Sequence, residues 1–181
     1  KPLIVKGARQ IGKTRSIEWF ASQHYKNVVQ INFVEQPKYR AIFDDGYEVD
    51  TILKNISLLN PELRFSPGET IFFFDELQSC PNCATSLKFF KLDGRFDVIC
   101  SGSLMGINYK EIESNSVGYK EDYEMHSMDF EEFLWALDND MLMPFIRNCY
   151  EKKQPMGQAL HRKAMDSGAS YRGGKRTYLP I

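Results

Sequence analysis

The sequence predicts an α/β protein with a parallel sheet that is flanked by helices, and three observations support this fold class. Short apolar segments typical of buried strands alternate with segments of helical periodicity. A glycine-rich segment joins the first apolar segment, residues 3–5, to the first helical pattern. Residues 70–74 contain a continuous apolar run, which is typical of a strand buried on both faces. In such a sheet, ligands are expected at the carboxyl ends of the strands.

The composition is that of an ordinary globular protein with one domain. The chain has 181 residues, of which 43% are hydrophobic and 26% charged, and its formal net charge is −1. This charge does not support nucleic-acid binding. No apolar run approaches the ~18 residues that cross a bilayer, and the N-terminus does not have the pattern of a signal segment. We therefore expect a cytoplasmic protein without a membrane partner.

Helix and strand patterns follow one another regularly in the first half of the chain. An apolar stripe of helical period runs from Val49 to Leu59. It ends before Pro61, because a residue that precedes proline disfavours the helical conformation. In chain order, the patterns predict a helix at residues 14–25, a strand at 28–33, a helix at 49–59 and a strand at 70–74.

The alternation continues in the second half and then changes. Asp129 and Glu132 have the spacing of a helix start, and the periodicity is lost from Ser167 onward. The predicted elements are a helix around residues 84–92, a strand at 96–100, a short strand within 123–128, a helix that begins at Asp129 and a helical segment over 142–149. We expect a core at residues 1–128, a helical extension at 129–166 and a disordered or non-native tail at 167–181.

The most informative motif is the segment from Gly7 to Thr14, which fits the pattern G-x-x-x-x-G-K-[ST] of a phosphate-binding loop. Glycines let the backbone N–H groups point at phosphates, and the helix behind the loop adds positive potential. Lys13 is expected to reach the β- and γ-phosphates, and Thr14 to hold Mg²⁺ through its hydroxyl. A turn without a ligand would not need the Lys-Thr pair. The expected nucleotide-binding residues are Gly7, Ala8, Arg9, Gln10, Ile11, Gly12, Lys13, Thr14 and Arg15.

Polar residues follow two of the predicted strands. Asp75 follows the apolar run and is expected to support Mg²⁺ beside Thr14. Glu76 would then polarise a water for attack on the γ-phosphate, although acidic pairs are more often solvated strand ends. Ser103, after the next strand, either contacts the γ-phosphate or the attacking water, or belongs to a turn of small residues. The expected catalytic residues are Glu76, Lys13 and Ser103.

The chain has four cysteines, too few for a disulfide framework at this length. Cys80 and Cys83 have the spacing of a zinc or redox site. A structural zinc site needs a complete tetrahedral ligand set, and the sequence has no second pair of this kind. The alternative is a helix start with Pro81 in its first turn.

Taken together, these motifs resemble the bacterial and archaeal AAA-type P-loop ATPases that carry a C-terminal domain of unknown function. The resemblance covers about residues 1–166 and implies an AAA-like P-loop core with ATP and Mg²⁺ as cofactors, followed by a helical extension and, in intact members, a second domain. An upstream helix is expected before Lys1, so the chain is interpreted as a fragment of the ATPase region. The segments that carry the resemblance are GARQIGKT at 7–14, FFFDELQ at 72–78, GSLMG at 102–106 and MDFEEFLWA at 128–136.

The leading hypothesis is ATP binding with Mg²⁺-dependent hydrolysis, and the alternative is a binding or switch module with negligible turnover. A small-molecule kinase is disfavoured because Glu76 suits hydrolysis better than transfer to a hydroxyl. A GTPase is disfavoured because the sequence lacks an Asn-Lys-x-Asp element. The partner is open between an unknown protein, a C-terminal domain and a second copy of the chain. Arg95 and Arg147 are arginine-finger candidates by residue type alone.

Overall fold

A computed structural model describes residues 1–103 and 118–173 of the chain. The chain divides into two compact units, Lys1–His126 and Ser127–Ile181. The boundary between them lies close to the expected division after residue 128. In the part of the chain that the structure describes, no helix is long and apolar enough to cross a membrane.

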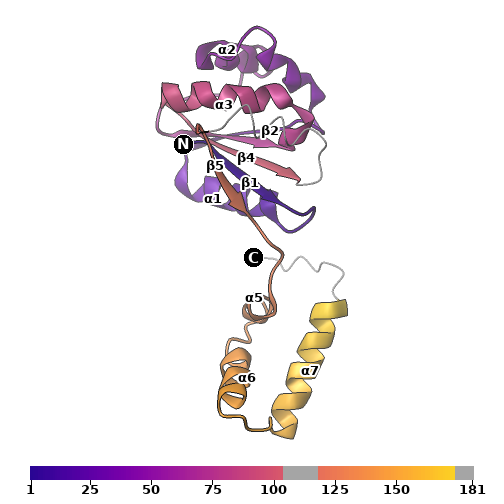
Figure 1. The fold of residues 1–181 in the computed structure, drawn as a ribbon. Coiled ribbons are helices and arrows are strands. Elements are labelled where there is room, and N and C mark those ends of the chain that lie inside the picture. Colours follow the sequence, from indigo (N-terminus) through magenta and orange to yellow (C-terminus); the bar gives the residue numbers. More distant parts are fainter. Residues whose placement is uncertain (104–117, 174–181) are drawn as a thin grey trace. The chain divides into compact units, whose positions relative to one another are not determined.

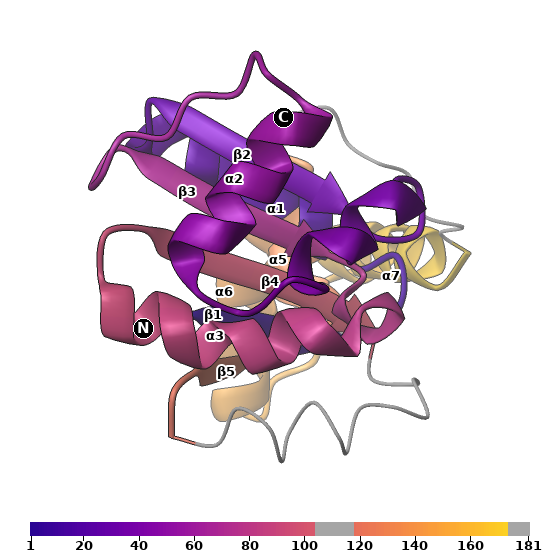
Figure 2. The ribbon, with the colours of Figure 1, turned by 90° about the horizontal axis from the view of Figure 1, so that it is seen from above.

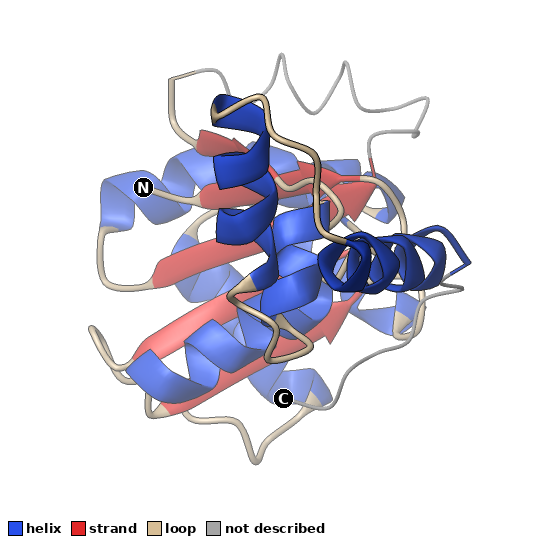
Figure 3. Cartoon of the chain, turned by 90° about the horizontal axis from the view of Figure 1, so that it is seen from below, coloured by secondary structure: helices blue, strands red, loops and turns tan. Residues whose placement is uncertain are grey.

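The first unit is built on a sheet whose strands all run in the same direction (Figures 1, 2 and 3). This sheet has five strands in the order β2-β3-β4-β1-β5. The α/β class and the parallel sheet predicted from the sequence are therefore confirmed. The strands are β1 (Leu3–Gly7), β2 (Asn27–Asn32), β3 (Thr70–Asp75), β4 (Asp97–Ser103) and β5 (Glu121–Glu124).

Helices cover both faces of this sheet. Helix α1 lies on one face, and α2 and α3 lie on the other (Figures 1 and 2). Short 3-10 helices η1 and η2 follow β2 and β3, and the sequence patterns did not predict them. The elements are α1 (Lys13–His24), α2 (Val49–Leu59), α3 (Pro81–Asp93), η1 (Pro37–Phe43) and η2 (Leu77–Ser79).

Strand β3 is buried along its whole length, as its apolar run predicts. Successive side chains of a strand point to opposite faces. Phe72 and Phe74 therefore pack into the larger core, where the ring centroids of Phe72 and Phe90 of α3 lie 5.4 Å apart. Ile71 and Phe73 belong to the smaller core together with α1. Two cores hold β3 rigidly, so the residues at its carboxyl end have a fixed position.

Strand β5 lies at the edge of the sheet and begins earlier than the sequence predicts. The expected strand fell within residues 123–128, whereas β5 is Glu121–Glu124 and is exposed throughout. Its residues lack the alternating pattern of a half-buried strand, so the sequence could not mark its start. The Lys6 ammonium, on the neighbouring β1, forms a 2.8 Å ion pair with Asp122. Burying a charge costs free energy unless the charge is paired. The ion pair with Asp122 offsets this cost for Lys6, which is largely buried.

Three helices make up the described part of the second unit: α5 (Phe130–Trp135), α6 (Leu142–Glu151) and α7 (Gln158–Gly173). The helix start predicted at Asp129 is confirmed and forms a capping box: Asp129 Oδ1 accepts from the Glu132 amide at 2.8 Å, and Glu132 Oε2 accepts from the Asp129 amide at 2.9 Å. Helix α7 continues to Gly173, past Ser167, where the sequence predicts an irregular tail to begin. Helix α7 contacts α5 and α6, and such tertiary contacts cannot be read from the local composition of this segment. Residues 174–181 of the expected tail lie outside the described residues.

Candidate active site

The phosphate loop, residues 7–14, connects β1 to α1 at the carboxyl edge of the sheet. Gly7 is required there by close packing. A Cβ at this position would lie 2.3 Å from the carbonyl oxygen of Met125 and 2.6 Å from Cδ1 of Ile11. Both distances are far shorter than a van der Waals contact, so the loop can pass under the chain after β5 only with glycine here.

Helix α1 begins at this loop without a side-chain cap. Gly12 is its N-cap residue, and none of the described side chains caps it. The first turn also lacks acidic residues, which would compete with a bound anion. Uncapped amides at a helix N-terminus favour phosphate, both through hydrogen bonds and through the helix dipole.

Lys13 folds back onto the loop. Its ammonium donates to the carbonyl oxygens of Gly7 at 3.1 Å and of Ala8 at 2.6 Å. The side chain is buried, and burial lowers the pKa of Lys13, against the opposing attraction of Glu76 and Asp75. The loop thus holds a buried positive charge directly beside the helix N-terminus.

Asp75, the last residue of β3, joins the phosphate loop to the sheet. It is 4% exposed, and each of its carboxylate oxygens accepts two hydrogen bonds. Thr14 Oγ1 donates to Oδ2 at 3.1 Å across 61 positions of sequence. The other donors are Asn32 Nδ2 at 3.3 Å, the Glu76 amide at 3.0 Å and the hydroxyl of Ser101.

The sequence did not predict that Asn32 and Ser101 donate to Asp75. Parallel register places Asn32 directly opposite Asp75, and Ser101 follows Cys100, the partner of Phe74. The available signal was a polar residue at or near the end of each apolar strand. Without the strand order, that signal did not show which polar residues become neighbours.

The donors at this position fit Mg²⁺. A hydroxyl and a carboxylate are oxygen donors, and Mg²⁺ typically takes one or two such groups together with phosphate oxygens. Among the described residues, no group of three or more His, Cys, Asp and Glu side chains gathers into an all-protein metal cage. Thr14 and Asp75 are therefore the residues that could hold the ion, because their hydrogen bond already places both oxygens together.

Glu76 lies next to this site in a left-handed backbone conformation, with φ 58° and ψ 48°. Its Oε2 accepts a hydrogen bond from Nε2 of Gln78. Oε1 of Gln78 in turn accepts from the amide of Ser103, at the end of β4, at 3.3 Å. Glu76 and Ser103 are thus connected through a residue that sequence analysis did not identify as functional.

The other expected loop residues lie where a ligand could meet them. Ala8, Arg9 and Gln10 are exposed, Ile11 is half-buried, and Arg15 is exposed on the first turn of α1. Their expected roles in nucleotide binding remain predictions. The segment at 104–106, part of the resemblance that includes Ser103, lies outside the described residues.

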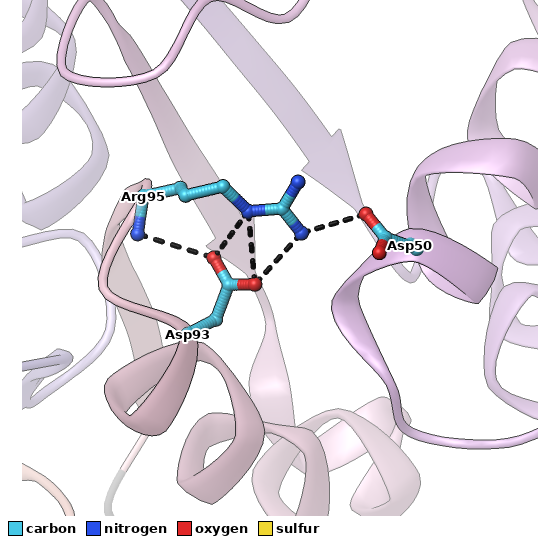
Figure 4. A network of polar contacts seen from close by, with 3 residues as sticks. All are labelled: Asp50, Asp93 and Arg95. Atoms are coloured by element: carbon cyan, nitrogen blue, oxygen red, sulfur yellow. Dashed lines mark hydrogen bonds and ion pairs between the residues drawn. The ribbon is translucent and has the colours of Figure 1, made fainter.

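Arg95 cannot reach the nucleotide site of its own chain. It precedes the amino end of β4, whereas the phosphate loop follows the carboxyl end of the parallel strand β1. Its guanidinium donates to Asp93 at 2.7 Å and to Asp50 of α2 at 2.6 Å, which ties α2 to the end of α3 (Figure 4). These hydrogen bonds raise the pKa of Arg95 and lower that of Asp93. Arg147, in the second unit, pairs with Glu131.

The cysteine pair is a helix start, as one of the two interpretations predicts. Pro81 lies in the first turn of α3, and Cys80 is its N-cap residue. Burial raises the pKa of Cys80 to about 11 and raises that of Cys83 well above its ordinary value. These thiols therefore stay protonated near neutral pH and pack as small apolar groups.

Alkylation should distinguish the cysteines of the folded protein. At pH 8 we expect iodoacetamide to modify Cys149, which is partly exposed, before the buried Cys80, Cys83 and Cys100. The thiolate is the reactive form, and burial disfavours it. Peptide mass spectrometry, with the denatured chain as the control, measures the order. Equal labelling of all four in the native protein would contradict this packing.

Comparisons with known proteins concern the family and the fold of the chain. The chain matches the AAA domain family over residues 1–134. It is similar to a chain in a solved structure of Drosophila ORC bound to DNA, with a TM-score of 0.50 and 14% identity. That similarity covers 84% of this chain and 44% of the ORC chain, and at this identity it concerns the fold alone. No curated protein matches the chain. The family match spans the whole first unit, and the chain belongs to the AAA domain family.

Proposed function

We propose that this chain binds ATP with Mg²⁺ at the phosphate loop and hydrolyses it. The observation that supports this best is the 3.1 Å hydrogen bond between Thr14 and Asp75. It brings the hydroxyl at the start of α1 together with the carboxylate at the end of β3, beside the buried ammonium of Lys13. Membership of the AAA domain family supports nucleotide binding independently.

Binding would begin with an exchange of partners at Lys13. Its ammonium now contacts the carbonyl oxygens of Gly7 and Ala8, and phosphate oxygens are stronger acceptors because they are charged. The uncapped amides at the start of α1 would bind further phosphate oxygens. Mg²⁺, held by Thr14 and Asp75, would neutralise negative charge on the β- and γ-phosphates when bound.

In the hydrolytic step, Glu76 would accept a proton from water as general base. The water oxygen forms a bond to the γ-phosphorus, the bond from that phosphorus to the bridging oxygen breaks, and ADP leaves with the bond's electron pair. Ser103, connected to Glu76 through Gln78, would contact the γ-phosphate or the water.

The metal-binding part of the proposal is tested with Thr14→Val. This change keeps the size of the side chain and removes the hydroxyl, so it should weaken Mg²⁺-ATP about 10-fold or more and metal-free ATP much less. Titration of a fluorescent ATP analogue, with Mg²⁺ and with chelator, measures both constants. Asp75→Asn is expected to weaken Mg²⁺-ATP binding in the same way as Thr14→Val. This change also disturbs the four hydrogen bonds that the Asp75 carboxylate accepts.

Thr51→Val on α2 is the matched control, because it makes the same substitution on a helix outside the site. It should leave both constants unchanged. Equal losses with and without Mg²⁺ in Thr14→Val would mean that this hydroxyl supports the loop and not the ion.

A further inference from the structure

We propose that Gln78 is a positioning residue that holds the carboxylate of Glu76 in place and connects it to the end of β4. This inference rests on the proposed hydrolysis, in which Glu76 is the general base. It assigns a role to an amide that follows the acidic pair and precedes α3.

Both ends of the Gln78 amide are occupied in a way that fixes its orientation. Nε2 donates to Oε2 of Glu76, and Oε1 accepts from the backbone amide of Ser103 at 3.3 Å. A flipped amide would place Nε2 against the N–H group and Oε1 against the carboxylate, so both hydrogen bonds would be lost. The side chain can therefore bridge these two groups in one orientation.

The neighbouring strand has room for this bridge at Gly102. A Cβ on Gly102 would lie 3.2 Å from Oε1 of Gln78 and 3.8 Å from Cβ of Leu77. The first distance is tighter than an ordinary van der Waals contact, so a larger residue would require the Gln78 amide to shift by a few tenths of an ångström. Glycine at this position lets the Gln78 side chain lie close to β4 without that shift.

The backbone and the side chain of Glu76 are held by different contacts. A left-handed conformation is unfavourable for a residue other than glycine and is found mostly where the surrounding structure enforces it. The buried Leu77, whose carbonyl accepts from the Cys80 amide at 3.0 Å, anchors the chain just after it. This anchor fixes the backbone of the turn, and the Gln78 hydrogen bond adds a constraint on the otherwise flexible glutamate side chain.

The hydrogen bond from Gln78 leaves the Glu76 carboxylate able to accept a proton. Among the described residues, only Gln78 donates to the Glu76 carboxylate, and it does so at Oε2. Oε1 can therefore take the proton from water while Oε2 stays bound. Because the same amide also contacts Ser103, a shift at the end of β4 on nucleotide binding would move the base directly.

The experiment measures ATP affinity and single-turnover hydrolysis for Gln78→Met and Gln78→Glu. Methionine keeps the length and removes both hydrogen bonds. Glutamate keeps an acceptor for the Ser103 amide but places a second carboxylate against Glu76. We expect hydrolysis to fall about 10- to 100-fold in both variants, with ATP affinity and melting temperature nearly unchanged, because misplacement of a reacting group acts on the chemical step.

Gln30→Met is the matched control. Gln30 also donates to a glutamate, Oε1 of Glu18, at 2.8 Å, but on the exposed surface. This variant should hydrolyse ATP as fast as the wild type. A slow Gln30→Met variant would overturn the assignment of the effect to the site.

A double-mutant cycle decides whether Gln78 acts through Glu76. In the Glu76→Gln background, Gln78→Met should cause no further loss, because residues that act as a unit are not additive. A multiplicative further loss, or wild-type hydrolysis by Gln78→Met and Gln78→Glu, would overturn the inference. If the Met variant does not fold, Gln78→Glu decides. Wild-type hydrolysis by Glu76→Gln itself would instead remove the base from the proposed function, and this inference with it.

Discussion

Glu76→Gln is expected to lower ATP hydrolysis about 10²–10⁴-fold while ATP still binds, because that is the usual contribution of a general base. The glutamine side chain has the same size, and its carbonyl oxygen can still accept from Nε2 of Gln78. The left-handed turn and the bridge to β4 should therefore persist. What is lost is the basicity of the carboxylate. Single-turnover hydrolysis with saturating Mg²⁺-ATP, beside a separate affinity titration, measures the two effects.

Glu62→Gln provides the control for this substitution. Glu62 is exposed and lies between α2 and β3, away from the phosphate loop. It should leave both hydrolysis and affinity unchanged. If Glu76→Gln hydrolyses ATP as fast as the wild type, Glu76 has no part in the chemistry. If the wild type binds Mg²⁺-ATP without turnover, the alternative of a nucleotide-dependent binding or switch module replaces hydrolysis.

Periodicity alone predicted most of the fold, because buried strands and amphipathic helices carry their signal locally. The apolar run of β3 and the stripe of α2 are examples. Hydrophobic periodicity did not predict segments whose buried residues lack the regular spacing of a strand or an α-helix. Strand β5 is exposed at every residue. The 3-10 helix η1 has three residues per turn, so its buried residues, such as Tyr39 and Ile42, do not follow the 3.6-residue period. Helix α7 extends beyond its expected end, and its contacts with α5 and α6 leave no local signal in the sequence.

The residues of the candidate site also fall into two groups, those with a local sequence signal and those without one. Residues 7–14 and the acidic pair at 75–76 are consecutive in sequence, so spacing was enough to identify them. Asn32 and Ser101 reach Asp75 through strand register, and Gln78 reaches Ser103 through the 3-10 turn η2. These neighbours are distant in sequence and have ordinary polar side chains. Only the order of the strands and the path of the turn bring them together.

Position in the fold also excludes Arg95 from the nucleotide site of its own chain. Arg95 had the right charge for an arginine finger, but it precedes β4 and is bound by two carboxylates on the far edge of the sheet. The phosphate loop lies at the opposite, carboxyl ends of the strands.

Lys13→Ala should weaken ATP binding by about one to two decades in Kd, since a charge-assisted contact contributes about 1.5–3 kcal/mol. The native ammonium is buried and contacts the Gly7 and Ala8 carbonyl oxygens, so its removal also leaves these acceptors without that donor. Melting temperature must be measured alongside affinity. Lys54→Ala, an exposed position on α2, is the matched control and should change neither.

The pH dependence of affinity separates the charge of Lys13 from its packing. Burial lowers the pKa of Lys13 in the free protein, so its protonated, phosphate-binding form is lost at lower pH than for an exposed lysine. Bound phosphate favours the protonated form and raises the pKa again. Affinity for metal-free ATP should therefore fall as pH rises from the free-state toward the bound-state pKa, and this fall should be absent in Lys13→Ala. Unchanged affinity in a folded Lys13→Ala protein would contradict nucleotide binding at the phosphate loop.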